Sequence, residues 1–149
     1  MELKELERTY TELGGEVKKF KKERGKIEIG YRIRYSKKIS EVDVFAFGLM
    51  SGDWNPIHFD EEFASKTRFA GRVVHGMLTT SLVSAAVAKL SGTAVLIETK
   101  FSYLKPVRIG ETVEVVCEIT EIKGNKYTLK AECFTEEKVV EGEVQILLW

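Results

Sequence analysis

The stretch SGDWNPIHFD, residues 51–60, places a carboxylate close before one of only two histidines in the chain. A carboxylate and an imidazole on a Pro-stiffened loop can share proton transfers, so Asp53 and His58 are candidates for general acid–base catalysis. A structural interpretation also fits, in which Asp53 caps a loop, Asn55 and Pro56 form the turn, and His58 packs or caps a helix. Spacing alone leaves both interpretations open.

The segment VVHGML, residues 73–78, is the second candidate for chemistry. Gly76 falls at the start of a predicted helix, where free backbone N–H groups and the positive end of the helix dipole can bind an oxyanion, and glycine lets a ligand approach closely. Alternatively, Gly76 only permits a tight entry to the helix, and His75 is a turn or core histidine. The loop and the helix start are complementary, because one moves protons and the other stabilises negative charge.

Two predicted helices must position these residues. Ser40 and Asp43 resemble a capping box, after which an apolar face ends at the loop; its members are Val42, Phe45, Ala46 and Leu49. The loop therefore follows a helix. Residues 76–90, GMLTTSLVSAAVAKL, carry no charge before Lys89 and predict a helix that is buried on every face.

The other elements have the period of strands. Apolar residues alternate from Ile27 to Tyr35, and strand-like segments follow at roughly 94–104, 111–122, 127–135 and 138–148. Antiparallel strands with one uncharged helix favour a curved sheet wrapped around that helix, because nothing else in the chain is long enough to cover it. The predicted fold class is α+β.

Residues 1–25 form an N-terminal extension with a helical apolar stripe, which consists of Leu3, Leu6, Tyr10, Leu13, Val17 and Phe20. Gly14 and Gly15 interrupt it at a cost of about 2 kcal/mol relative to alanine, so the pattern predicts either two short helices or one continuous helix. Such a helical extension can cover the domain or a partner subunit, or act as an interaction module.

The charge balance narrows the classes of partner. Lys plus Arg total 23 and Asp plus Glu total 23, so no global field favours nucleic acid or an anionic membrane. The first residues lack the pattern of a signal peptide, and no stretch approaches about 18 uninterrupted apolar residues. We expect a soluble, cytoplasmic protein that binds neither nucleic acid nor membrane.

Together, SGDWNPIHFD and the later VHGML resemble the hydratase signature of the MaoC-like, (R)-specific enoyl-CoA hydratase family. The resemblance covers roughly residues 27–149 and includes the order of helix and strands. It implies a hot-dog fold for residues 26–149, preceded by the helical extension of residues 1–25.

The resemblance also implies residue roles. Asp53 and His58 become the catalytic acid–base pair and Gly76 the oxyanion-hole donor. Asn55 shapes the loop, His75 joins the substrate-binding residues, and Ser84 offers a hydroxyl from the central helix toward the loop. The implied lyase reaction hydrates trans-2-enoyl-CoA to (R)-3-hydroxyacyl-CoA, or reverses that step, without cofactor or metal.

We expect the protein to bind an acyl-CoA thioester substrate and to form a homodimer or higher homo-oligomer. An open sheet leaves edges that a second copy can pair, and the resemblance implies a shared tunnel at that interface.

Other functions fit parts of the same pattern. The fold can serve a 3-hydroxyacyl-carrier-protein dehydratase, or bind acyl-CoA as a non-catalytic regulator. A thioesterase is disfavoured, because residues 76–90 lack the acidic residue that hot-dog thioesterases typically carry there. Metal binding by Asp53, His58 and His75 lacks the usual ligand spacing.

Several cations are candidates for binding the phosphates of coenzyme A or of a carrier protein, although a solvated surface is the better explanation of each one taken singly: Lys66, Arg68, Arg72, Lys105 and Arg108.

The two cysteines test the pairing of two predicted strands. Matching the apolar faces of residues 111–122 and 127–135 predicts a three-residue loop at 124–126, which places Cys117 opposite Cys133. We expect reduced, packed thiols rather than a disulfide.

Overall fold

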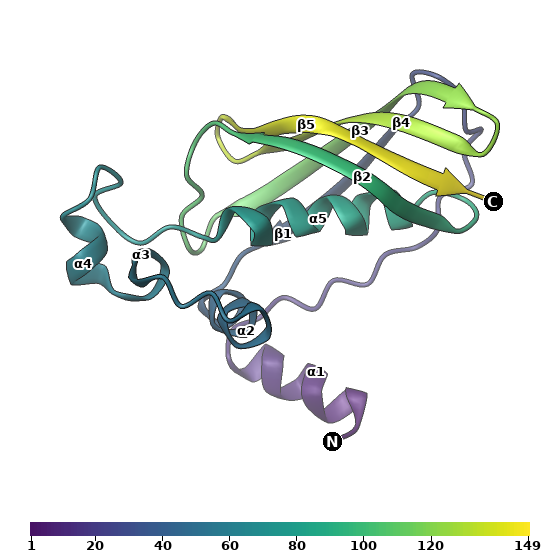
Figure 1. Cartoon of the computed structure of the whole chain (residues 1–149). Coiled ribbons are helices and arrows are strands. Elements are labelled where there is room, and N and C mark those ends of the chain that lie inside the picture. Colours follow the sequence, from purple (N-terminus) through teal and green to yellow (C-terminus); the bar gives the residue numbers. More distant parts are fainter.

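The computed structural model describes all 149 residues and shows a curved antiparallel sheet wrapped around one helix (Figure 1). The strands are β1 (Arg32–Lys38), β2 (Ala94–Tyr103), β3 (Thr112–Lys123), β4 (Lys126–Phe134) and β5 (Lys138–Leu148), in the sheet order β1-β3-β4-β5-β2. The predicted α+β class and hot-dog fold are confirmed.

Helix α5 (Gly76–Ala88) lies in the concave face of the sheet. Leu82, Val83, Ala86 and Val87 are buried in one apolar cluster with side chains from the sheet, including Ile33, Val115, Leu129 and Ile146. Fully burying one such side chain contributes about 1.5–3 kcal/mol, so this packing is the main force that fixes α5. The predicted central helix is therefore correct. Its N-terminal end lies at the end of the molecule opposite the C-terminus of the chain (Figure 1).

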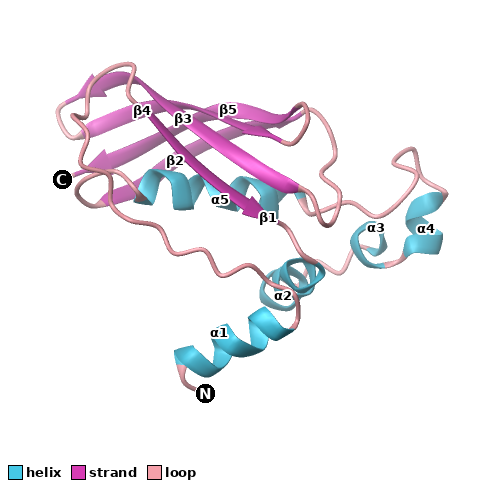
Figure 2. Cartoon of the chain, turned by 180° about the vertical axis from the view of Figure 1, so that it is seen from behind, coloured by secondary structure: helices cyan, strands magenta, loops and turns pink.

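The remaining helices lie outside the sheet (Figure 2). They are α1 (Leu3–Glu12), α2 (Glu41–Ser51), α3 (Pro56–Phe59) and α4 (Glu61–Ser65). The predicted capping box at the start of α2 is present, with the Ser40 backbone N–H and hydroxyl each 2.8 Å from Asp43 Oδ2. The two short helices α3 and α4 lie near the start of α5.

The strand predicted from Ile27 begins later, at Arg32. The Tyr31 backbone N–H donates to the Glu28 carbonyl at 3.0 Å, and Gly30 has a φ of 90°, so this part of the segment forms a turn. Ile29 is consequently 66% exposed. The apolar residues of this segment alternate as they do in a strand, so the sequence pattern alone could not reveal the turn.

The N-terminal extension follows neither predicted helical arrangement. Helix α1 ends before Gly14, whose φ of 93° terminates it, and residues 15–25 form no regular secondary structure. We call residues 15–25 the strap. Its Lys22 Nζ binds the carbonyl oxygens of Ala88 at 2.7 Å and Gly92 at 2.6 Å, so contacts with the end of α5 replace helical hydrogen bonds.

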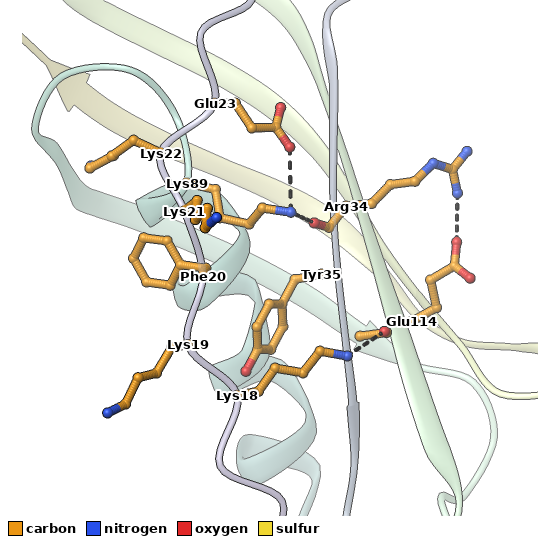
Figure 3. A pocket seen from close by; sticks show the side chains of 11 residues that line it. Lys18, Lys19, Phe20, Lys21, Lys22, Glu23, Arg34, Tyr35, Lys89 and Glu114 are labelled. Carbon is orange, nitrogen blue, oxygen red and sulfur yellow. Dashed lines mark hydrogen bonds and ion pairs between the residues drawn. The ribbon is translucent and has the colours of Figure 1, made fainter.

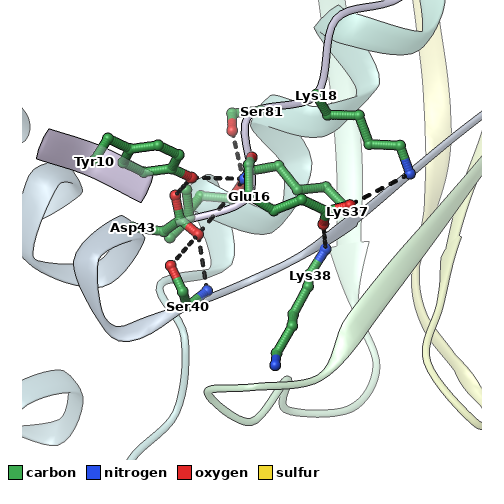
Figure 4. A network of polar contacts seen from close by, with 9 residues as sticks. Tyr10, Glu16, Lys18, Lys37, Lys38, Ser40, Asp43 and Ser81 are labelled. Atoms are coloured by element: carbon green, nitrogen blue, oxygen red, sulfur yellow. Dashed lines mark hydrogen bonds and ion pairs between the residues drawn. The ribbon is translucent and has the colours of Figure 1, made fainter. Parts of the chain in front are cut away.

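A polar network connects the extension to β1 and α2 (Figure 4). The Tyr10 hydroxyl donates to Asp43, and Lys37 Nζ lies 2.7 Å from both the Tyr10 hydroxyl and the Glu16 carbonyl. The Lys38 backbone N–H donates to Glu16 Oε2 at 2.8 Å. The extension is thereby fixed along the outer edge of β1.

The predicted opposition of the two cysteines is wrong. Strands β3 and β4 are joined by a two-residue turn, since Lys123 pairs with Lys126, and a bulge between Ile119 and Glu121 shifts the register. Cys117 therefore lies opposite Ala131, while Cys133 lies opposite Val115. The faces were assigned correctly, and both thiols are buried and free.

None of the helices combines the length and apolar character required to cross a membrane.

Candidate active site

The loop after α2 holds Asp53 in a fixed orientation. Helix α2 ends at Gly52, which is left-handed with a φ of 78°, and the Asn55 backbone N–H donates to Asp53 Oδ1 at 3.1 Å. The Asn55 side chain in turn accepts from the Ile57 N–H at 3.4 Å and caps α3, which begins at Pro56. These bonds occupy Asp53 Oδ1 and leave Oδ2 free.

His58 is oriented by a backbone carbonyl. Its Nδ1 lies 2.7 Å from the Val73 carbonyl oxygen, which can only accept a hydrogen bond, so Nδ1 carries a proton. In the neutral ring the lone pair is then on Nε2, which lies 4.0 Å from Asp53 Oδ2. A water molecule about 2.8 Å from both atoms can donate one hydrogen to each.

His75 contacts both Asp53 and His58. Its ring stacks on His58 with centroids 3.8 Å apart, and its Nε2 donates to the Asp53 carbonyl at 3.1 Å. Burial lowers its pKa below the usual value of 6.5, an effect that the bond to Asp53 opposes. His75 is therefore neutral at pH 7, and its buried Nδ1 has no partner.

An ion pair on the outer side of the loop fixes the backbone of His58. Arg72 Nε donates to the His58 carbonyl at 2.7 Å, and its Nη2 contacts Glu41 Oε1 at 2.6 Å. Arg108 binds the carbonyl oxygens of Phe69, Gly71 and Arg72. Both guanidinium groups, predicted as possible phosphate ligands, thus hold the protein's own backbone.

Gly76 begins α5, and its backbone N–H has no acceptor in the protein. The Tyr103 ring packs so closely that a Cβ atom on Gly76 would lie 2.8 Å from it. The contact with Tyr103 at the end of β2 therefore disfavours any side chain at position 76.

A cavity of about 340 Å³ brings these elements together. Asn55, His58 and Gly76 line it, and most of the remaining wall is apolar, including Ile57, Phe69, Val73, Val74, Leu104 and Val107. Asp53 does not line it but lies 4.0 Å from His58, and its side chain is half exposed, at 48%. A weakly solvated wall strengthens the action of the Gly76 N–H on developing negative charge.

Ser84 does not line this cavity. It lies two turns beyond Gly76 on α5 and is exposed within the single chain. Conversely, sequence reasoning missed Thr79 and Tyr103, which do line it. Thr79 was accessible to prediction, since it is one turn after Gly76, but the approach of Tyr103 depends on how the end of β2 meets α5.

The group Asp53, His58 and His75 offers ligand atoms within 4.8 Å of one another. A zinc ion needs its ligand atoms to converge at about 2.0–2.2 Å. The imidazoles lie 28° from parallel, so their in-plane lone pairs do not converge, and each ring already uses one nitrogen on a carbonyl. The arrangement suits proton transfer better than metal coordination.

Comparisons with known proteins identify the family and several relatives of the chain. A family model described as MaoC like domain matches residues 21–142. The 3-hydroxybutyryl-CoA dehydratase of Methylorubrum extorquens is 37% identical over 80% of this chain and 80% of its own. The (R)-hydratase of Aeromonas caviae, described as involved in PHA biosynthesis, superposes with a TM-score of 0.77 at 32% identity, covering 83% of this chain and 98% of its own.

A crystal structure of a protein from Archaeoglobus fulgidus is similar over almost the whole chain. It has a TM-score of 0.97 and 55% identity, covering 99% of this chain and 95% of its own. That coverage includes the N-terminal extension, which lies largely outside the match to the family model.

The lowered pKa of His75 makes stability depend on pH. Below pH 6.5 the unfolded chain takes up a proton that buried His75 refuses, so the free energy of unfolding should fall as the pH drops below 6.5. Urea titrations should show a smaller fall for His75→Gln than for the wild type. An identical pH slope in the two proteins would contradict a buried neutral His75.

Proposed function

The chain belongs to the MaoC-like domain family, and we propose that Asp53, His58 and Gly76 carry out its hydratase chemistry. It is an enoyl-CoA hydratase or dehydratase, a lyase that acts on trans-2-enoyl-CoA and (R)-3-hydroxyacyl-CoA. The observation that supports the residue assignment is the 4.0 Å space between His58 Nε2 and Asp53 Oδ2, beside the cavity that His58 and Gly76 line. We further propose that residues 26–149 form the domain and residues 1–25 an added extension.

Water adds across the C2–C3 double bond in this scheme. The water held by Asp53 and His58 attacks C3 through its oxygen, and one of its protons passes to the pair. The double-bond electrons move toward the thioester, and a proton from the pair then goes to C2. Dehydration follows the reverse path with the same groups.

The Gly76 N–H stabilises the charge that this addition creates. Attack at C3 requires the thioester oxygen to become an enolate oxygen, and a helix N-terminal N–H without another acceptor can bind it.

Arg68 and Lys105 are the cations that we propose for the coenzyme A phosphates. Both line the cavity, whereas Lys66 pairs with Glu62 outside it. Lys105 has only a weak contact with Glu137, at 3.9 Å between exposed side chains. Both cations are thus available to a substrate.

The homodimer is proposed through β2. The other sheet edge, β1, is covered by the extension, whereas β2 has no neighbour on its outer side. Val95 and Ile97 of this strand are 42% and 47% exposed. Such exposure of apolar residues is unusual in a strand whose outer edge pairs with no other chain. A cytoplasmic location is likewise proposed, and cell fractionation would test it.

The catalytic assignment predicts that Asp53→Asn and His58→Gln each lower kcat by about 10²–10⁴-fold. Asp53→Asn keeps an oxygen for the Asn55 N–H, so the loop should persist. The assay follows loss of the enoyl absorbance of crotonyl-CoA, with Glu62→Gln as an exposed control.

Full activity in both variants would overturn the assignment. Release of free thiol without hydration would indicate a thioesterase, and binding without turnover would indicate a regulator.

The phosphate assignment predicts that Arg68→Gln with Lys105→Gln raises KM for crotonyl-CoA on the order of tenfold, with kcat little changed. Crotonyl-N-acetylcysteamine lacks the phosphates, so its kinetics should not respond. Lys66→Gln is the matched control. Equal effects on both thioesters would show that the cations only support the fold.

The dimer assignment predicts that Val95→Lys with Ile97→Lys weakens self-association at micromolar concentration, because lysine opposes edge pairing. Light scattering should give a dimer for the wild type and for Leu6→Lys, the same change at an exposed residue of α1. A monomeric wild type would contradict the proposal.

A further inference from the structure

A second concave site lies between the strap and β1, away from the active cavity (Figure 3). This groove has a volume of about 570 Å³ and is lined by residues 18–23 of the strap, residues 34–36 of β1, Lys89 and Glu114. It shares no residue with the active cavity. Lys89 follows the end of α5, so a helix length of about 20 Å separates it from Gly76.

The strap is anchored at both ends of the groove. Lys18 Nζ lies 3.1 Å from the Ser36 hydroxyl, and the Glu23 backbone N–H donates to the Lys89 carbonyl at 2.7 Å. Lys22 binds three carbonyl oxygens after α5. The walls are therefore held before any ligand arrives, which reduces the ordering cost of binding.

Positive charge dominates the walls although the chain as a whole is neutral. The lining contains six cations and the carboxylates Glu23 and Glu114. Four of the cations pair with carboxylates in or beside the groove: Lys18 with Glu16 at 3.8 Å, Lys19 with Glu7 at 2.9 Å, Lys89 with Glu23 at 3.4 Å and Arg34 with Glu114 at 2.5 Å. Lys21 and Lys22 have no carboxylate partner. Lys22 mainly binds carbonyl dipoles, which leave its charge uncompensated, and Lys21 has no polar partner. A compact anion with several oxygens matches this set.

Aromatic rings accompany the cations. Phe20 is 41% exposed within the run of lysines, and the Tyr35 ring lies across the groove from the strap (Figure 3). The Tyr35 hydroxyl has no hydrogen-bond partner in the protein. An exposed phenylalanine among lysines contributes little to the core but offers a face on which a base can stack.

We propose that this groove binds a nucleoside phosphate, with the base on Phe20 and the phosphates on Lys18 and Lys21. The ligand chemistry has two possible sources, a free nucleotide or the adenosine bisphosphate end of a coenzyme A molecule. The site is independent of the Asp53 and His58 chemistry, because no groove residue enters the active cavity.

Calorimetric titration of the full chain tests the site with ADP, adenosine 3′,5′-bisphosphate and inorganic pyrophosphate. ADP or the bisphosphate should bind, and Lys18→Gln with Lys21→Gln should weaken binding about tenfold or more. Phe20→Ala should weaken nucleotide binding about five- to a hundredfold without changing that of pyrophosphate. Lys123→Gln with Lys126→Gln, at the distant β3–β4 turn, is the matched control.

The outcomes separate the possibilities. Tighter binding of the bisphosphate assigns the groove to the end of coenzyme A, and tighter binding of ADP assigns it to a free nucleotide. Pyrophosphate binding as tightly as either nucleotide, or no binding at millimolar concentration, overturns the proposal, as does adsorption to anionic phosphatidylglycerol vesicles alone. Crotonyl-CoA hydration by the Lys18 and Lys21 variant should stay normal, which distinguishes failure here from failure of the hydratase assignment.

Discussion

The hydrogen bond from His58 Nδ1 to the Val73 carbonyl determines what the active site can do. At 2.7 Å it fixes both the tautomer and the direction of the ring, so that the Nε2 lone pair faces Asp53. The Val73 carbonyl is itself held in place by two backbone hydrogen bonds. The Val73 N–H donates to the Ile57 carbonyl at 3.3 Å, and the Val74 N–H donates to the Val107 carbonyl at 2.8 Å. Loop, sheet and helix start are thereby joined around one imidazole.

The buried helix α5 completes the arrangement. Its apolar packing in the concave sheet fixes where its first N–H points, and the same sheet brings Tyr103 against Gly76. In the proposed mechanism, proton transfer and charge stabilisation thus come from different segments that meet only in the folded chain. The opposite end of α5 holds the strap, so the single central helix also supports the basic groove.

Much of this could be predicted from sequence, because periodicity reports which face of an element is buried. The capping box at Ser40, the uncharged helix from Gly76 and the four later strands follow from local patterns. Register does not follow in the same way: the two-residue turn and the bulge beside Thr120 together changed the partner of Cys117 without changing its face. The strap was missed because its hydrogen bonds go to residues near Gly92, far along the chain.

The candidate site residues could be selected from the sequence because aspartate and histidine are rare in this chain and closely spaced here, but their geometry required tertiary contacts. Neither the stacking of His75 on His58 nor the contact of Tyr103 with Gly76 has a local signal. Nitrogen-15 NMR of the His58 ring tests the central geometry most directly. In the neutral form of the ring, the structure predicts the proton on Nδ1 and a bare Nε2, whereas a proton on Nε2 would contradict it.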